Sequence, residues 1–131
     1  MPLRRMCCAA VAAAVAVLLS GCGNLNADEV ESAASAFAGA QDPAARCELL
    51  APATLTALVE EESSPCEEAI GTVEIGSGDV LSVEVWGEEA QATLADDTLF
   101  LTRTSSGWRV MAAACTPQGA EQPYECQLEG S

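Results

Sequence analysis

The chain of 131 residues lacks histidine, and its five basic residues are all arginines, so it lacks lysine as well. These absences remove the side chains that most often act as general bases, Schiff-base nucleophiles and imidazole metal ligands. Aromatic residues amount to 4%, and 20 acidic residues give a formal net charge of −15. A nucleic-acid binder needs cationic side chains to neutralise phosphates. The composition therefore excludes nucleic acid as a partner and argues against catalysis.

The N-terminal residues have the organisation of a lipoprotein signal peptide. Arg4 and Arg5 precede a 14-residue apolar run, 6–19, which is too short to cross a bilayer as a helix. The run leads into Leu19-Ser20-Gly21-Cys22, which resembles the bacterial lipobox, whose cysteine takes a diacylglyceryl group before cleavage. An ordinary secreted signal peptide with a chance cysteine is the alternative. We expect a signal peptide at 1–21, a lipidated tether at 22–27 and one domain at 28–131, held at the extracytoplasmic face of the cell membrane.

Removal of the signal peptide leaves three arginines against 20 acidic residues, a formal net charge of −17. Anionic head groups repel such a chain, so the lipid at Cys22 has to provide the membrane anchor. Acidic runs such as Glu60-Glu61-Glu62 lack the spacing of a calcium-binding loop. We interpret all the acidic runs, including Asp96-Asp97, as solvated surface, and predict no metal site.

Four cysteines remain beyond Cys22, namely Cys47, Cys66, Cys115 and Cys126. An even number in a small exported domain indicates two disulfides, for which three connectivities are open. We predict Cys47–Cys66 and Cys115–Cys126, because each pair lies within one local region of the sequence. A four-cysteine zinc site is the alternative, but the spacings contain no C-x₂-C knuckle.

The first half of the mature chain has helical patterning. Apolar residues recur with helical spacing from Val30 to about Ala40, after a capping pattern that begins at Asn26. Asp42-Pro43 and Pro52 begin two further predicted helices. Ser64-Pro65 is interpreted as the cap and first residue of a short fourth helix that ends at Gly71.

From Thr72 onward the period of the apolar residues changes to two, which indicates strands. The expected strands cover 72–75, 80–86, 90–94, 99–104 and 108–115, joined as an antiparallel meander. The sequence Trp86-Gly87-Glu88-Glu89 is typical of a type II′ hairpin turn. Helices followed by strands predict an α+β fold.

The expected register pairs Val85 with Ala90, Leu94 with Leu99, and Arg103 with Trp108, so that one sheet face becomes apolar. That face should receive the helices, and it consists of Leu81, Val83, Val85, Ala92, Leu94, Leu99, Leu101, Val110 and Ala112.

The other face carries a candidate partner patch made of Trp86, Phe100, Arg109 and Met111. The register places Phe100 opposite Met111 and beside Thr93. Aromatic, methionine and arginine side chains are enriched in protein interfaces. The alternative is that the N-terminal segment or the C-terminal tail covers these residues as a satellite of the core.

Several motifs add a family resemblance to these patterns. They are the lipobox, Pro65-Cys66, Gly107-Trp108-Arg109-Val110, the run from Ala112 to Pro117, and Pro123-Tyr124-Glu125-Cys126. Together they resemble a group of bacterial lipoproteins of the nuclear-transport-factor-like, or SnoaL-like, cone fold. The resemblance covers most of the mature chain and implies N-terminal helices on one face of a curved, cone-like antiparallel sheet, without an activity.

We expect a non-catalytic interaction module of the cell envelope that is anchored by its lipid and binds another envelope protein. The alternative is a carrier that holds a small apolar ligand in a pocket between helices and sheet. A cone-fold isomerase or hydrolase would require a buried carboxylate facing a pocket. We predict no catalytic residues and no cofactor.

Overall fold

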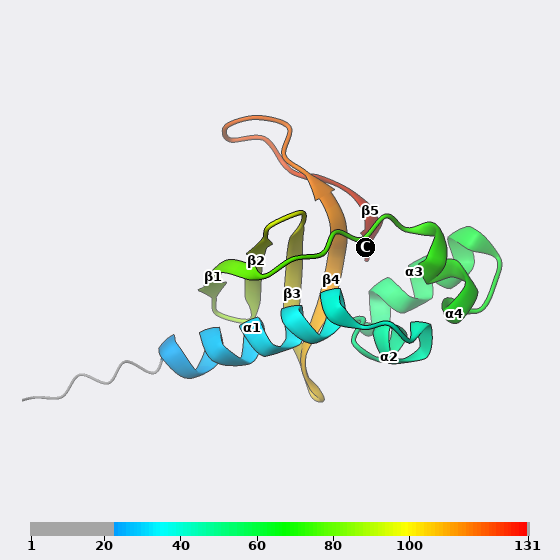
Figure 1. Ribbon diagram of the computed structural model, residues 1–131, viewed down its shortest axis with the longest axis horizontal. Helices are drawn as coiled ribbons and strands as arrows, with labels where there is room; N and C mark the ends of the chain where they lie inside the picture. The colour runs from blue at the N-terminus through cyan, green and yellow to red at the C-terminus, as the bar shows by residue number, and fades with distance from the viewer. Residues whose placement is uncertain (1–22, 131) are drawn as a thin grey trace, which may run out of the picture.

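The computed structural model describes residues 23–130, so the predicted signal peptide and Cys22 lie outside the described residues. The elements follow one another as α1 (Gly23–Gly39), α2 (Pro43–Glu48), α3 (Pro52–Glu62), α4 (Cys66–Ala69), a 3₁₀ turn (Ile70–Thr72), β1 (Val80–Trp86), β2 (Glu89–Leu94), β3 (Thr98–Thr104), β4 (Gly107–Thr116) and β5 (Glu125–Glu129). The strands form one antiparallel sheet in the order β1-β2-β3-β4-β5 (Figure 1). The predicted α+β order of helices followed by an antiparallel sheet is therefore confirmed.

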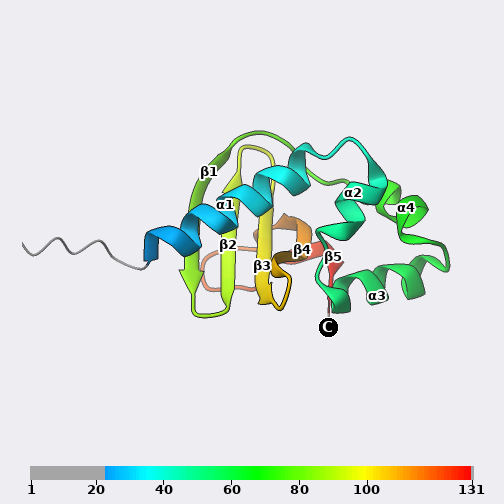
Figure 2. The ribbon, with the colours of Figure 1, turned by 90° about the horizontal axis from the view of Figure 1, so that it is seen from below.

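The long helix α1 lies across one face of the sheet (Figure 2) and contacts β1, β2, β3 and β4. Val30, Ala34 and Phe37 follow one another at helical spacing and are fully buried against the strands. Because α1 begins at Gly23, the residues expected as a tether form its first turns, and Asn26 lies within the helix instead of capping it. The Asn26 side chain accepts a hydrogen bond from Arg103 on β3.

The short helices α2, α3 and α4 gather beside the β4–β5 side of the sheet (Figure 2). Asp42 caps α2 as predicted, since its carboxylate accepts the Ala44 N–H at 3.1 Å and Pro43 occupies the first helical position. The prediction for α4 is wrong in detail: Pro65 is the residue before the helix, and no side chain caps it. The first residue of this four-residue helix, Cys66, is held by its disulfide to Cys47.

The β1–β2 hairpin has the predicted pairs Val85–Ala90 and Val83–Ala92. Gly87 has φ +59°, as the first central residue of a type II′ turn requires. The expected inward position of Leu81 is wrong, because a bulge between Val80 and Ser82 leaves the Leu81 side chain 68% exposed. A bulge of this kind in an edge strand disrupts further pairing.

The β2–β3 register differs from the prediction by two residues. Thr93 pairs with Thr98, and the turn runs from Leu94 to Asp97, so Leu94 does not pair with Leu99 as a ladder residue. Side chains along a strand alternate between the two sheet faces with a period of two residues. A shift of two residues therefore keeps each side chain on its expected face. It also places Gln91 opposite Phe100, in the position beside Phe100 where Thr93 was expected.

The end of the sheet contains further corrections. The expected first strand, 72–75, is not a strand but an irregular connection that leads from the 3₁₀ turn toward β1. The fifth strand is β5, which pairs with the second half of β4. In β4 itself a bulge at Met111 makes Phe100 pair with Ala112, so Phe100 is not opposite Met111. Ala112 therefore shares a face with Phe100, and its expected place on the apolar face is wrong.

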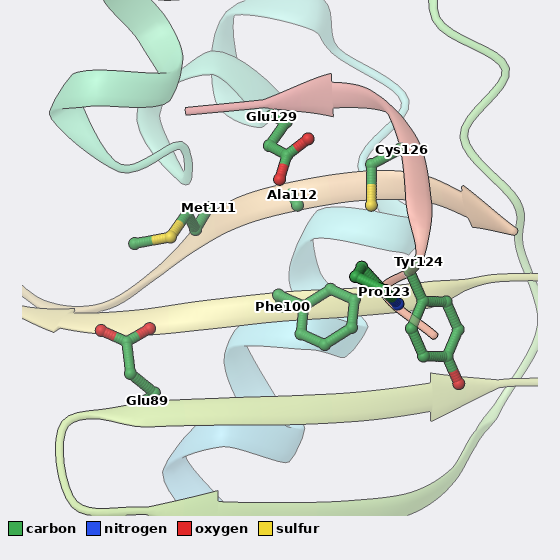
Figure 3. A pocket seen from close by; sticks show the side chains of 8 residues that line it. All are labelled: Glu89, Phe100, Met111, Ala112, Pro123, Tyr124, Cys126 and Glu129. Carbon is green, nitrogen blue, oxygen red and sulfur yellow. The ribbon is translucent and has the colours of Figure 1, made fainter. Parts of the chain in front are cut away.

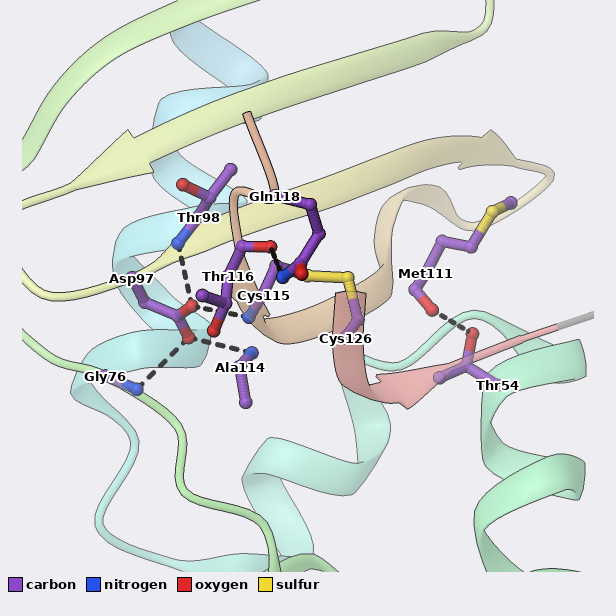
Figure 4. Close-up of a disulfide and its surroundings, with 10 residues drawn as sticks. All are labelled: Thr54, Gly76, Asp97, Thr98, Met111, Ala114, Cys115, Thr116, Gln118 and Cys126. Atoms are coloured by element: carbon purple, nitrogen blue, oxygen red, sulfur yellow. Dashed lines mark hydrogen bonds between the residues drawn. A yellow bond between two sulfur atoms is a disulfide. The ribbon is translucent and has the colours of Figure 1, made fainter. Parts of the chain in front are cut away.

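Both predicted disulfides are present. Cys47–Cys66 joins α2 to the start of α4 with a Cα–Cα distance of 6.2 Å. Cys115–Cys126 joins residues directly opposite one another on β4 and β5 (Figure 4). The second bond closes the segment 116–125 that connects these two strands.

Candidate functional site

A groove of about 360 Å³ lies on the sheet face opposite α1 (Figure 3). It is lined by Glu89, Phe100, Met111, Ala112, Pro123, Tyr124, Cys126 and Glu129. Phe100 faces the groove because its neighbours Leu99 and Leu101 are fully buried on the other face of β3. Strand alternation thus places an aromatic ring on the face that the helices leave uncovered.

The aromatic wall of the groove consists of Phe100 and Tyr124. Their ring centroids are 5.2 Å apart at an interplanar angle of 70°, an edge-to-face arrangement. Tyr124 belongs to the segment between β4 and β5, and the disulfide at Cys126 holds that segment against the sheet. Part of the site therefore comes from the C-terminal segment.

Met111 forms the opposite wall, and its backbone is fixed from two directions. Its carbonyl oxygen accepts the Thr54 hydroxyl at 2.8 Å (Figure 4). The same oxygen also accepts the Gly130 N–H at 3.0 Å. Thr54 is itself fully buried on α3. The bulge that changes the β3–β4 register is thus bonded to both the helical layer and the chain after β5.

Two carboxylates approach the groove from opposite sides. Figure 3 shows Glu89 leaning from β2 over β3 and Glu129 leaning from β5 over β4. Glu89 is oriented by Thr102, whose hydroxyl donates to Glu89 Oε1 at 2.9 Å. Both glutamates are exposed, as is Pro123, so the rim of the groove is open to water.

The candidate partner patch is only partly brought together by the structure. Phe100 and Met111 line the groove, whereas Trp86 and Arg109 do not. Trp86 is 55% exposed at the end of the β1–β2 hairpin. Arg109 pairs with Thr102 as expected, but its Nη1 donates to the Trp108 carbonyl at 2.9 Å.

Sequence reasoning missed the role of Asp97, which it grouped with the solvated acidic runs. Its carboxylate accepts four backbone N–H groups, from Gly76, Thr98, Ala114 and Cys115 (Figure 4). Ala114 has φ +54°, a left-handed conformation that turns its N–H and that of Cys115 toward the same carboxylate. Asp97 is a structural residue that joins β4 to two turns. No sequence pattern identified the four donors, because they come from three separate segments of the chain.

The described residues contain neither a free thiol nor a metal-binding cluster. Within 23–130 all four cysteines are in disulfides, and no group of three or more Cys, Asp or Glu side chains is arranged to hold a metal ion. None of the helices between Gly23 and Gly130 is both long and apolar enough to cross a membrane. The groove exposes aromatic, thioether and carboxylate side chains.

Comparisons with protein-family models, curated proteins and solved structures find no significant match for this chain.

Proposed function

We propose that the protein is a lipid-anchored, non-catalytic interaction module of the cell envelope that binds another envelope protein through the groove. The observation that carries the proposal is the apolar groove on the uncovered sheet face, with Phe100, Met111 and Tyr124 in its lining. Aromatic and methionine side chains are typical of the centres of protein interfaces.

Two features support an extracytoplasmic location. Leu19-Ser20-Gly21-Cys22 has the lipobox pattern, and the two disulfides are of the kind that persists in oxidising compartments. We also propose a cone-like curvature of the sheet, as in the SnoaL-like lipoproteins that the sequence motifs resemble.

The packing favours this function over an apolar-ligand carrier. A carrier would need open space between the helices and the sheet. In that layer Phe37, Leu99 and Leu101 are fully buried members of one continuous core. A hollow of about 500 Å³ does lie between α1 and residues 77–80, but its lining includes Glu31, Ser35 and Asp79, which do not suit an apolar ligand. The groove with the aromatic lining lies on the other face of the sheet.

Membrane anchoring is tested by fractionating cells that express the wild type and the Cys22→Ser variant. The wild type should remain with the membrane and carry acyl chains on its mature N-terminus. The variant should leave the membrane fraction, because it lacks the thiol that takes the lipid. A variant that stays membrane-bound, together with an N-terminus free of acyl chains, would refute the anchor.

Partner binding is tested by placing a photoreactive amino acid at Met111 of the full-length protein in its own cells. A matched control carries the same amino acid at Thr56, which is exposed on α3. We expect a discrete protein adduct from position 111 that is absent from position 56 and is lost with Tyr124→Ser. Identical adducts from both positions, or none from position 111, would show that the groove is not a protein-binding site.

A further inference from the structure

We propose that the partner inserts a basic, apolar segment into the groove: an extended stretch whose Lys or Arg groups meet Glu89 and Glu129, and whose apolar side chains lie on Phe100, Met111 and Tyr124. The inference depends on the proposed function and adds the chemistry of the partner. It rests on charge complementarity and on the composition of the groove walls.

The carboxylates of the groove lack a cationic partner among residues 23–130. The side-chain hydrogen bond that Glu89 receives comes from the neutral hydroxyl of Thr102, which orients the charge without neutralising it. Glu129 lines the groove from the opposite side and is exposed. One negative charge on each side of the apolar floor favours a ligand that brings a positive group to each side of the groove.

The three arginines beyond the signal peptide are engaged elsewhere. Arg46 donates from Nε and Nη2 to two carbonyls at the end of α1, at 3.0 and 3.1 Å. Arg103 stacks over the Trp108 ring, 5.2 Å from its centroid, and donates to Asn26. Arg109 lies across Thr102 from Glu89 on the same sheet face, but its Nη1 is bonded to the Trp108 carbonyl and it forms no ion pair with Glu89. None of these three arginines neutralises the carboxylates of Glu89 and Glu129, so a cation from a partner can do so.

The walls suit the stems of long basic side chains. Lys and Arg bury their methylene groups on apolar surface while their charged ends remain in water. Phe100 and Tyr124 offer ring faces and edges to such stems, and a cation near a ring face gains further attraction. Met111 adds a flexible thioether that adapts to different side chains.

The shape of the site favours a chain segment over a small organic cation. A volume of about 360 Å³ is at the lower end for ligand pockets, which enclose most of the surface of a small molecule. Here Glu89, Pro123 and Glu129 are exposed on the rim, so an occupant would remain partly solvated. A segment of a larger partner tolerates this because only some of its side chains need to enter.

The test uses the full-length lipidated protein in phosphatidylcholine vesicles and a fluorescein-labelled peptide, Leu-Lys-Leu-Arg-Leu. Neutral lipid avoids electrostatic capture of the peptide, and empty vesicles correct for partitioning. A second peptide carries Glu at both basic positions. Fluorescence anisotropy should show saturable binding of the basic peptide, weaker at high salt because the contacts are exposed ion pairs, and no binding of the acidic peptide.

The decisive comparison is between two double variants of equal charge. Glu89→Gln with Glu129→Gln neutralises the groove, and the new amide oxygen at position 89 can still accept from Thr102. Glu61→Gln with Glu62→Gln removes the same charge from the exposed end of α3. We expect the groove variant to bind the basic peptide about three- to tenfold more weakly than the wild type does. The α3 variant should change that affinity by less than about twofold.

The outcomes separate this inference from the proposed function. Equal effects of the two double variants, or failure of the basic peptide to bind, overturn the basic-segment inference. If the crosslink from position 111 persists in that case, the groove still binds a protein of other chemistry. If neither the crosslink from position 111 nor binding of the basic peptide is observed, the proposed function is refuted as well. Tight binding of n-butylammonium that competes fully with the peptide would also overturn the inference, since the site would then be a small-cation site.

Discussion

Replacing Asp97 by alanine should be among the most damaging single changes in this fold. The carboxylate accepts N–H groups from Thr98 at 2.7 Å, Ala114 and Cys115 at 3.0 Å, and Gly76 at 3.1 Å. Ala114 and Cys115 are buried, so water cannot readily replace the lost acceptor for their N–H groups. Each buried donor left without a partner costs about 1–3 kcal/mol, while donors nearer the surface can bind water instead.

The expected loss for Asp97→Ala is therefore about 3–5 kcal/mol in the free energy of unfolding. For a domain of this size that corresponds to a fall of roughly 10–20 °C in Tm. Asp97→Asn should give little relief although it keeps the shape. Each carboxylate oxygen accepts two N–H groups, so an amide nitrogen in place of either oxygen would face two donors.

Denaturant unfolding followed by circular dichroism measures the effect, and Asp96→Asn is the matched control. Asp96 is exposed, and its backbone N–H bond to Ser77 does not involve its side chain. The control should change the free energy of unfolding by less than about 0.5 kcal/mol. The reasoning is refuted if Asp97→Ala costs less than about 1 kcal/mol, or if the two aspartate positions behave alike.

Three further perturbations test other parts of the fold. Gly76→Ala should lower Tm sharply, because a Cβ there would overlap the Asp96 carbonyl; an unchanged melting curve would contradict that close approach. Replacing Cys47 and Cys66 together by serine should cost about 3 kcal/mol, since their bond closes a separation of 19 residues; chemical denaturation without reductant decides this. Arg46→Met keeps the aliphatic stem but loses two bonds to the last carbonyls of α1, and a loss of about 2 kcal/mol is expected in urea unfolding; no loss would show that these bonds contribute nothing.

The apolar pattern predicted the elements and their faces well, for a physical reason. Burial selects alternate residues in strands, so the faces of β2 and β3 remain correct although their register is two residues away from the expected one. Local pairs are equally readable: Asp42-Pro43 begins α2, and Gly87 forms the β1–β2 turn. The two disulfides follow from pairing neighbours in the sequence.

The errors occur where a side chain bonds to a distant backbone or where pairing depends on the partner strand. No local pattern shows that Asp97 will collect N–H groups from residues 17 and 18 positions further on. The carbonyl of the bulged residue Met111 accepts a hydrogen bond from Thr54, which is 57 residues away. The β-branched residues of 72–75 suit a strand but meet no partner strand, whereas the largely polar β5 pairs along β4.

The candidate site shows the same division. Strand alternation predicted that Phe100 and Met111 lie on the uncovered face, but the contribution of Tyr124 depends on the path of the chain between β4 and β5. Glu89 and Glu129 are indistinguishable from the other acidic residues in the sequence, since their position across one groove is a property of the folded sheet.

The bond between Cys115 and Cys126 has a consequence for the timing of maturation. Pro123 and Tyr124 reach the groove from the segment that this disulfide closes. A chain that is still in a reducing compartment lacks this closure, and its aromatic wall is tied to the sheet only by noncovalent contacts. If the groove binds the proposed partner, the chain with this bond reduced should bind it more weakly than the oxidised chain, because only the β4–β5 pairing and the Phe100–Tyr124 contact then hold Tyr124 in place. At the extracytoplasmic location proposed above, the groove would therefore reach full affinity only where oxidation has formed this bond.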